Sequence, residues 1–145
     1  MYNHVRYNDI LQFLEQHQQG VLGSRLSCGT LTTSYIPYAV NEHLQMHFGS
    51  CRGYATCAAF AHHPDVSITV LHDSTHPRFA AEIRGTVEYI PSEHTDATRS
   101  WLLRRNRATL FDHDHDDFVI CKVQPRVIRF MDLTTSRPRI DHINI

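Results

Sequence analysis

The chain has 145 residues, of which 41% are apolar and 20% are charged. This length fits one domain whose core needs no disulfide or metal for stability. The 14 Lys and Arg nearly balance the 15 Asp and Glu, which argues against a general nucleic-acid binder because such proteins carry a basic excess. No apolar run approaches the roughly 20 residues that cross a membrane, and the first residues lack a signal-peptide pattern. We therefore expect a cytoplasmic protein.

The first part of the chain predicts one helix and then strands. The helix is expected within residues 1–20, where an apolar face precedes Gly20. Three strands should follow, at residues 21–27, 30–40 and 44–48. Pro37 lies inside the second of these and cannot donate to a ladder, so we expect an edge or a bulge there.

The remaining chain predicts two helices and three further strands. A short Ala-rich helix is expected at 50–63, before Pro64, and a longer helix at 92–108. The strands are expected at residues 66–70, 79–89 and 117–132. Gly85 indicates a bulge or a close backbone approach, and Pro125 divides the last strand region. The tail, 133–145, has no periodicity that classifies it.

Six strands joined by tight turns imply antiparallel pairing. With few helices, they indicate a mainly β fold, a small closed barrel with flanking helices, and closure also removes unpaired edges. No repeat, low-complexity tract or linker interrupts the chain. We therefore predict a single domain over residues 1–145.

The four cysteines and 12 histidines raise the question of a metal site. None of the cysteines forms a C-x-x-C pair, so reduced thiols are expected, with Cys121 in the core. Histidines gather at 62–63, at His72 and His76, and in the segment 112–117, DHDHDD. In an extended segment His113 and His115 would share a face and could hold a divalent metal. A solvated acidic loop is the alternative, and because spacing fixes no third ligand, no metal site is predicted.

The segment Gly49–Gly53, GSCRG, lies between a predicted strand and a predicted helix. Backbone N–H groups at such a turn, with the helix dipole, favour an anion. Ser50 adds a hydroxyl, and Arg52 adds a cation suited to phosphate. The alternative is an ordinary capped helix with a surface arginine.

From Val21 to Glu88 the sequence resembles the pyridoxamine 5′-phosphate oxidase-like, FMN-binding split-barrel family. The resemblance rests on three segments: a strand ending in a Pro-containing stretch, the strand that leads to the 49–53 turn, and RFAAEIRGTVEYI. Two short matches lie within it, HPDVS at 63–67 and RGTV at 84–87. The order and spacing of these elements carry the resemblance.

The resemblance implies a six-stranded antiparallel split barrel and a homodimer with FMN in a groove at the interface. Ser50 and Arg52 match the phosphate-contacting turn of the family, and Arg84 is a further candidate for the phosphate, or else a surface strand arginine. The segment along the flavin ring corresponds to Ser34, Tyr35, Ile36 and Pro37. Phe48 and Gly49 match the strand end beside the ribityl chain.

Two departures from the family pattern limit what the resemblance implies. The family turn often carries a lysine, and Gly53 and Tyr54 stand there instead. The carboxy-terminal Arg-x-His signature of pyridoxamine-phosphate oxidases is not reproduced in residues 137–142, so vitamin B6 oxidation is not predicted.

Three functions remain open at this stage. The first is an FMN-dependent oxidoreductase acting on a small molecule, for which no residue stands out as an acid or base. The second is a haem-binding protein on the same barrel, with His142 as axial ligand and Arg137 and Arg139 beside the propionates. A polar tail is the alternative for these three residues. The third is a regulatory domain that keeps the fold without a cofactor.

Overall fold

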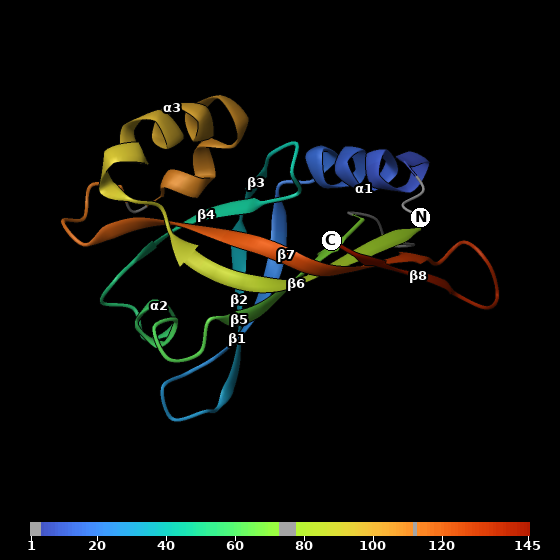
Figure 1. The fold of residues 1–145 in the computed structure, drawn as a ribbon, viewed down its shortest axis with the longest axis horizontal. Helices are drawn as coiled ribbons and strands as arrows, with labels where there is room; N and C mark the ends of the chain where they lie inside the picture. The colour runs from blue at the N-terminus through green and yellow to red at the C-terminus, as the bar shows by residue number, and fades with distance from the viewer. Residues whose placement is uncertain (1–3, 73–77, 112) are drawn as a thin grey trace.

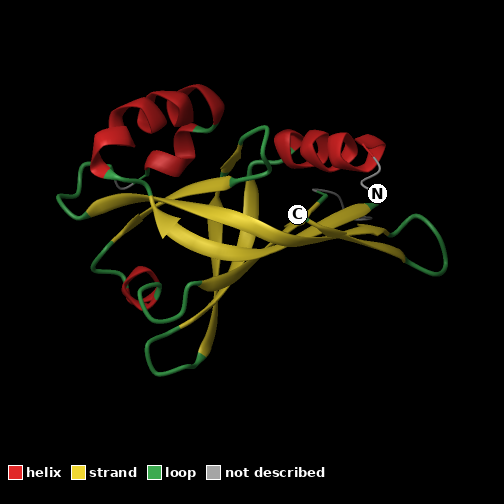
Figure 2. Ribbon diagram, in the orientation of Figure 1, coloured by secondary structure: helices red, strands yellow, loops and turns green. Residues whose placement is uncertain are grey.

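A computed structural model describes residues 4–72, 78–111 and 113–145, and it shows one mainly antiparallel β structure with helices around it (Figures 1 and 2). The strands are β1 (Gln19–Arg25), β2 (Leu31–Pro37), β3 (Ala39–Val40), β4 (Met46–Cys51), β5 (Asp65–Leu71), β6 (Phe79–Tyr89), β7 (Phe118–Asp132) and β8 (Arg139–Asn144). The helices are α1 (His4–Gln16), α2 (Ala55–Ala59) and α3 (Thr95–Arg105), with 3-10 turns η1 (Ser92–His94) and η2 (Arg107–Leu110).

The sheet curls into a half-barrel because one short segment supplies both of its ends, and among the described residues no strand pairing joins those ends. The strand order is β2-β1-β5-β6-β7-β4-β3, with β8 paired to β7 outside this path. Although β2 and β3 are at opposite ends, only Tyr38 separates them in the chain. The sheet must therefore curl until its two ends meet, which gives the split barrel that the sequence predicted.

The predicted number of six strands is wrong, because the described residues contain eight. The predicted strand 30–40 is divided at Tyr38 into β2 and β3. The tail, left unclassified, forms β8 along residues Val127–Asp132 of β7. An unpaired edge on the long strand β7 favours this addition, because pairing satisfies backbone groups that would otherwise meet only water.

Gly85 produces the bulge that the sequence indicated. The register between β6 and β7 shifts between Arg84 and Gly85. A Cβ on Gly85 would lie 2.1 Å from the carbonyl oxygen of Gln124. Pro125 has no N–H to donate to the ladder, and it pairs in register with Gly85 at this bulge. β7 continues through Pro125 as one strand and is not divided there.

The helices differ from the prediction in their limits. The first helix lies within residues 1–20 as predicted and ends at Gln16, because β1 begins at Gln19, whereas the predicted helix 50–63 is shortened to α2 because Ser50 and Cys51 extend β4. The predicted helix 92–108 becomes η1, α3 and η2. Its break lies at Asn106, whose backbone is extended (φ −156°).

The core fills the barrel, and the helices cover its openings and outer face. In Figure 1, α1 and α3 lie above β6 and β7, whereas α2 lies below them. Ile10 and Leu14 of α1 are fully buried, and the hydroxyl of Tyr38 donates to the Leu14 carbonyl at 2.8 Å. Within the described ranges, no helix has the length and hydropathy required to cross a bilayer.

Candidate functional site

A groove of about 510 Å³ opens where β2, the end of β4, α2 and η2 come together. Seven of the nine predicted cofactor residues line it: Ser34, Tyr35, Ile36, Pro37, Phe48, Gly49 and Ser50. These residues come from two segments that are not neighbours in sequence. They meet because β2 and β4 belong to opposite ends of a sheet that curls on itself.

The walls of the groove combine apolar surface with hydroxyl groups. Aromatic and aliphatic side chains supply flat contact area, while Ser34, Ser50 and Thr56 supply hydroxyls. On its free side β2 has no strand partner among the described residues, since β1 pairs with it only on the other side. Its outward N–H and C=O groups can therefore bond the polar edge of a bound ring.

Gly49 lets β4 approach η2 closely. A Cβ at this position would lie 2.1 Å from the Thr109 carbonyl oxygen and 2.7 Å from the Phe118 ring. Thr109 is buried, and its hydroxyl donates to the Asn106 carbonyl at 2.7 Å. This close contact sets the floor of the groove next to Ser50.

The backbone donors of the 52–54 turn are already used. The N–H of Arg52 donates to the Asp117 carbonyl, and the N–H of Gly53 donates to Oδ2 of the Asp117 carboxylate, each at 3.0 Å. The N–H of Tyr54 donates to the Cys51 carbonyl. A carboxylate of the chain itself thus occupies the position where the sequence predicted an external anion.

Arg52 lies beside the groove and does not line it. Its guanidinium stacks over the Tyr89 ring, 4.7 Å from the centroid. The pKa of the Cys57 thiol is lowered, first by its hydrogen bond with Cys121 and also by its hydrogen bonds with Tyr89 and Ser50 and by the Arg52 charge. Arg52 is exposed, so its side chain can leave Tyr89 for a ligand at Ser50 without breaking a buried contact.

Arg84 is separate from this groove. It lines a second cavity of about 410 Å³ together with Arg25 and Arg126, and its Nε donates to Glu82 at 2.5 Å. The structure thus brings together seven of the predicted residues, places Arg52 at their margin and leaves Arg84 elsewhere.

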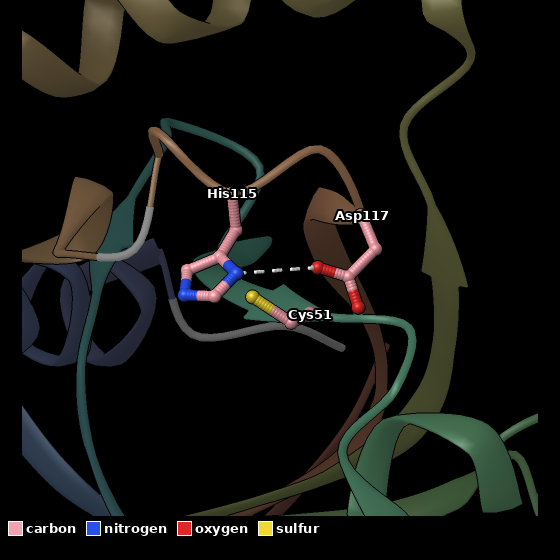
Figure 3. Close-up of side chains that lie close together, drawn as sticks. All are labelled: Cys51, His115 and Asp117. Atoms are coloured by element: carbon pink, nitrogen blue, oxygen red, sulfur yellow. Dashed lines mark ion pairs between the residues drawn. The ribbon is translucent and has the colours of Figure 1, made fainter.

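The histidine segments are distributed over several places. His113 and His115 lie in a turn and not in an extended strand, so they do not share a face as the metal hypothesis required. His115 instead lies with Asp117 beside Cys51 of β4, and Figure 3 shows the three side chains pointing toward one another. His76 and Asp112 lie outside the described residues.

The residues of the haem hypothesis lie on and beside β8. His142 is exposed and pairs in register with Arg129 of β7. Arg139 pairs with Asp141 at 3.6 Å, and Arg137 is exposed. None of these three residues lines the groove described above.

Sequence reasoning missed the part of the groove that η2 and α2 supply. These residues are Tyr54, Thr56, Phe60, Ala108, Thr109 and Phe111, together with Gln19 and Leu22 of β1. Phe111 is 86% exposed although it is a large apolar side chain. A phenylalanine next to the polar DHDHDD segment was the one visible signal.

No family model matches the sequence, and no curated protein matches it. Solved structures do match. A haem-binding protein from Mycobacterium smegmatis superposes with a TM-score of 0.79 and 16% identity over 95% of this chain, which spans 57% of that protein. A candidate pyridoxamine 5′-phosphate oxidase from Listeria innocua gives 0.70 and 25% identity, covering 86% of this chain and 97% of the other.

A third structure is a pyridoxamine 5′-phosphate oxidase-related, FMN-binding protein from Nostoc punctiforme. It gives a TM-score of 0.67 and 12% identity, covering 100% of this chain and 98% of the other. Proteins named for FMN and for haem therefore share this architecture. The chain has the split-barrel fold of the pyridoxamine 5′-phosphate oxidase-like FMN-binding proteins and of haem-binding proteins.

Proposed function

We propose that the groove binds FMN and that the protein is an FMN-dependent oxidoreductase acting on a small molecule. The observation that carries the proposal is the convergence of Ser34–Pro37 and Phe48–Ser50 on one groove beside an open strand edge. A flavin ring is planar and apolar on its faces, with hydrogen-bonding atoms along one edge. The backbone of β2 offers the complementary groups.

The lining residues favour a flavin over haem. Among the groove residues that the structure describes, none is a histidine, cysteine or methionine. Haem iron requires an axial ligand, supplied by His, Cys, Met or Tyr. Tyr35 and Tyr54 are the only side chains of this set, and the Tyr35 hydroxyl is bonded to Gln19 at 2.6 Å.

The phosphate end of the groove would be held by Ser50 and Arg52. For this Arg52 must move from the Tyr89 ring toward Ser50, two residues away. Asp117 places a negative charge on the same turn, which opposes a phosphate. We therefore expect weak retention of FMN, with most of the binding free energy supplied by the ring.

The flavin, when bound, would supply the electron-transfer chemistry. The chain would bind and orient it, and its groove residues would exclude water from the face they cover. Among the described groove residues there is no carboxylate or imidazole. We therefore assign no proton transfer to a side chain of this groove.

A second copy of the chain would complete the groove as a homodimer. Val21 and Tyr35 are opposite one another on β1 and β2, and Val21, Tyr35 and Leu31 are 40%, 70% and 71% exposed. Phe111 adds a further exposed ring at the groove. Tyr35 and Phe111 line the groove, whereas Leu31 lies farther along β2 beside the second cavity. Exposed apolar side chains of this kind support an interaction surface that extends along β2 from the groove.

Titration of the purified protein with FMN and with riboflavin tests the proposal. We expect both flavins to bind with quenched fluorescence. Arg52→Ala should weaken FMN binding by about 1–3 kcal/mol and leave riboflavin binding unchanged, because only FMN carries the phosphate. Arg84→Ala is the matched control and should leave both affinities unchanged.

Two outcomes contradict the proposal. If neither flavin binds at millimolar concentration, FMN is not the cofactor of this protein. A stoichiometric Soret band on addition of haem, with no flavin binding, assigns the barrel to haem instead.

A further inference from the structure

We propose that Cys51, His115 and Asp117 form a binding site for a divalent transition metal, with Zn²⁺ as the best match. One ligand atom from each side chain lies within 4.8 Å of the other two. Figure 3 shows the thiol, the imidazole and the carboxylate converging from two separate segments. This inference does not depend on what the groove binds.

The chemistry of the three groups suits Zn²⁺. Thiolate sulfur, imidazole nitrogen and carboxylate oxygen are its usual protein ligands, at about 2.0–2.3 Å. A tetrahedral site with these bond lengths places its ligands about 3.3–3.7 Å apart. The Nδ1 of His115 and Oδ1 of Asp117 are 3.8 Å apart, and all three ligand atoms lie within 4.8 Å of one another, so the side chains must close by about 1 Å to bind the ion.

The backbone holds the two segments together before any metal binds. Cys51 pairs in register with Phe118, directly after Asp117. The N–H of Arg52 donates to the Asp117 carbonyl at 3.0 Å, and the Phe118 N–H donates to the His115 carbonyl at 3.1 Å. The positions of the ligands are therefore fixed by the β4–β7 ladder and by the turn before it.

Asp117 has the supporting contact typical of a metal ligand. Its Oδ2 accepts a hydrogen bond from the Gly53 N–H at 3.0 Å, whereas Oδ1 faces His115. Second contacts of this kind orient ligating carboxylates and raise metal affinity. One carboxylate oxygen is thus held by the backbone and the other is directed at the proposed ion.

The three proposed ligands differ in burial. Cys51 is 1% exposed, whereas the side chains of His115 and Asp117 are 66% and 43% exposed. The side chains of His115 and Asp117 are therefore free to rotate toward an ion that arrives from solvent. With three protein ligands, a fourth position remains for water, the arrangement of Zn²⁺ sites that keep an open coordination position.

Charge balance favours a divalent cation. Binding replaces the proton of the Cys51 thiol by the metal and releases that proton to solvent. The thiolate and the Asp117 carboxylate then neutralise the two positive charges of the ion. Bound metal would also remove the negative charge that Asp117 places on the 52–54 turn.

The test is a Zn²⁺ titration of tag-free, chelator-treated protein against a competing chromophoric chelator. We expect one ion per chain, and Co²⁺ in place of Zn²⁺ should give a thiolate-to-metal charge-transfer band that reports Cys51. His115→Ala and Asp117→Asn should each weaken Zn²⁺ binding at least about tenfold. Asp117→Asn keeps an acceptor for the Gly53 N–H while it loses the charge.

Matched controls come from the same turn and from another cysteine. His113→Ala changes an exposed neighbour in the turn, and Cys28→Ser changes an exposed thiol outside the cluster; both should bind Zn²⁺ like the wild type. Cys51→Ser should abolish the Co²⁺ charge-transfer band, with circular dichroism confirming that the variant is folded. Because His115 is exposed, its alanine variant tests the site even if Cys51→Ser does not fold. Absence of stoichiometric Zn²⁺ binding, or wild-type affinity in His115→Ala, would overturn the proposal.

Discussion

Individual residues decide where the strands of this barrel can approach one another. At Gly85 the backbone of β7 occupies the space in which a side chain would lie, with the Gln124 carbonyl oxygen 2.1 Å from an ideal Cβ. The same is true of Gly49 against the Thr109 carbonyl. In both cases the obstructing atom is backbone and cannot rotate away.

Gly85→Ala should therefore destabilise the protein by about 2–3 kcal/mol, since the β6–β7 ladder must shift to admit the methyl group. Urea unfolding measures this free energy. Gly23→Ala is the matched control in another strand: its Cβ would meet the Ser67 hydroxyl, a movable group, at 3.1 Å, and should cost less than about 1 kcal/mol. Equal losses in the two variants would contradict the argument.

His47 gives the protein a specific sensitivity to acid. Burial, where His47 packs against Trp101, is the main cause that lowers the pKa of His47 from 6.5 to about 4; the Lys122 charge acts in the same direction, and backbone hydrogen bonds with Gln45 and Ala39 oppose it. Since the unfolded chain binds this proton more readily than the native state, the free energy of unfolding falls as pH decreases from about 6.5 to about 4.

At pH 4.5 this one group should account for a loss of about 2–3 kcal/mol relative to pH 7. His47→Gln cannot take up the proton, so its unfolding free energy should depend less on pH over this range by that amount. Chemical unfolding of both proteins at several pH values measures the difference. Parallel pH profiles would show that the buried imidazole is not responsible.

At the scale of elements, Asn106 joins three segments that form one side of the molecule. Its Nδ2 donates to the carbonyls of Gln18 and Tyr38, at 2.9 and 2.8 Å. Its Oδ1 accepts from Ala108 and so begins η2. The residue is 7% exposed, so water cannot readily replace it.

We expect Asn106→Ala to cost about 1–3 kcal/mol, because the buried Tyr38 carbonyl and the Ala108 N–H lose their Asn106 partner, whereas the Gln18 carbonyl still accepts from the Tyr38 N–H. The same variant should weaken flavin binding, since Thr109 of the groove lies in η2 and Phe111 follows η2 directly. Asn144→Ala, at an exposed position of β8, is the control and should change stability by less than about 0.5 kcal/mol. Thermal unfolding and flavin titration read out the two effects, and wild-type stability in Asn106→Ala would contradict this assignment.

At the scale of the whole molecule, the exposed apolar residues of β1, β2 and η2 predict a homodimer. Leu31→Glu should shift the chain to a monomer, because a charge buried in an apolar contact is not compensated. Leu103→Glu on α3, where the side chain is 48% exposed, should leave the assembly unchanged. Light scattering after size-exclusion chromatography measures the mass, and a monomeric wild type or a dimeric Leu31→Glu variant would exclude this interface.

Much of the fold could be predicted from local patterns in the sequence. Alternation of apolar and polar residues in 79–89, and the single Gly85 within it, predicted the longest regular pairing and its bulge, because both are properties of consecutive residues. Pro37 likewise marked the division between β2 and β3. The limits of the helices were less accurate, since Ser50 and Cys51 are held in β4 by pairing with β7, a contact no local pattern contains.

The candidate site shows the same division. The sequence by itself determined which short segments carry suitable groups: Ser34–Pro37, Phe48–Ser50 and the DHDHDD turn. Only the tertiary structure decided what they meet, because curling of the sheet joins β2 to β4, and the β4–β7 ladder brings Cys51 to His115 and Asp117. The third metal ligand lies more than 60 residues from the other two, and sequence spacing fixes a site only when its ligands share an element or a turn.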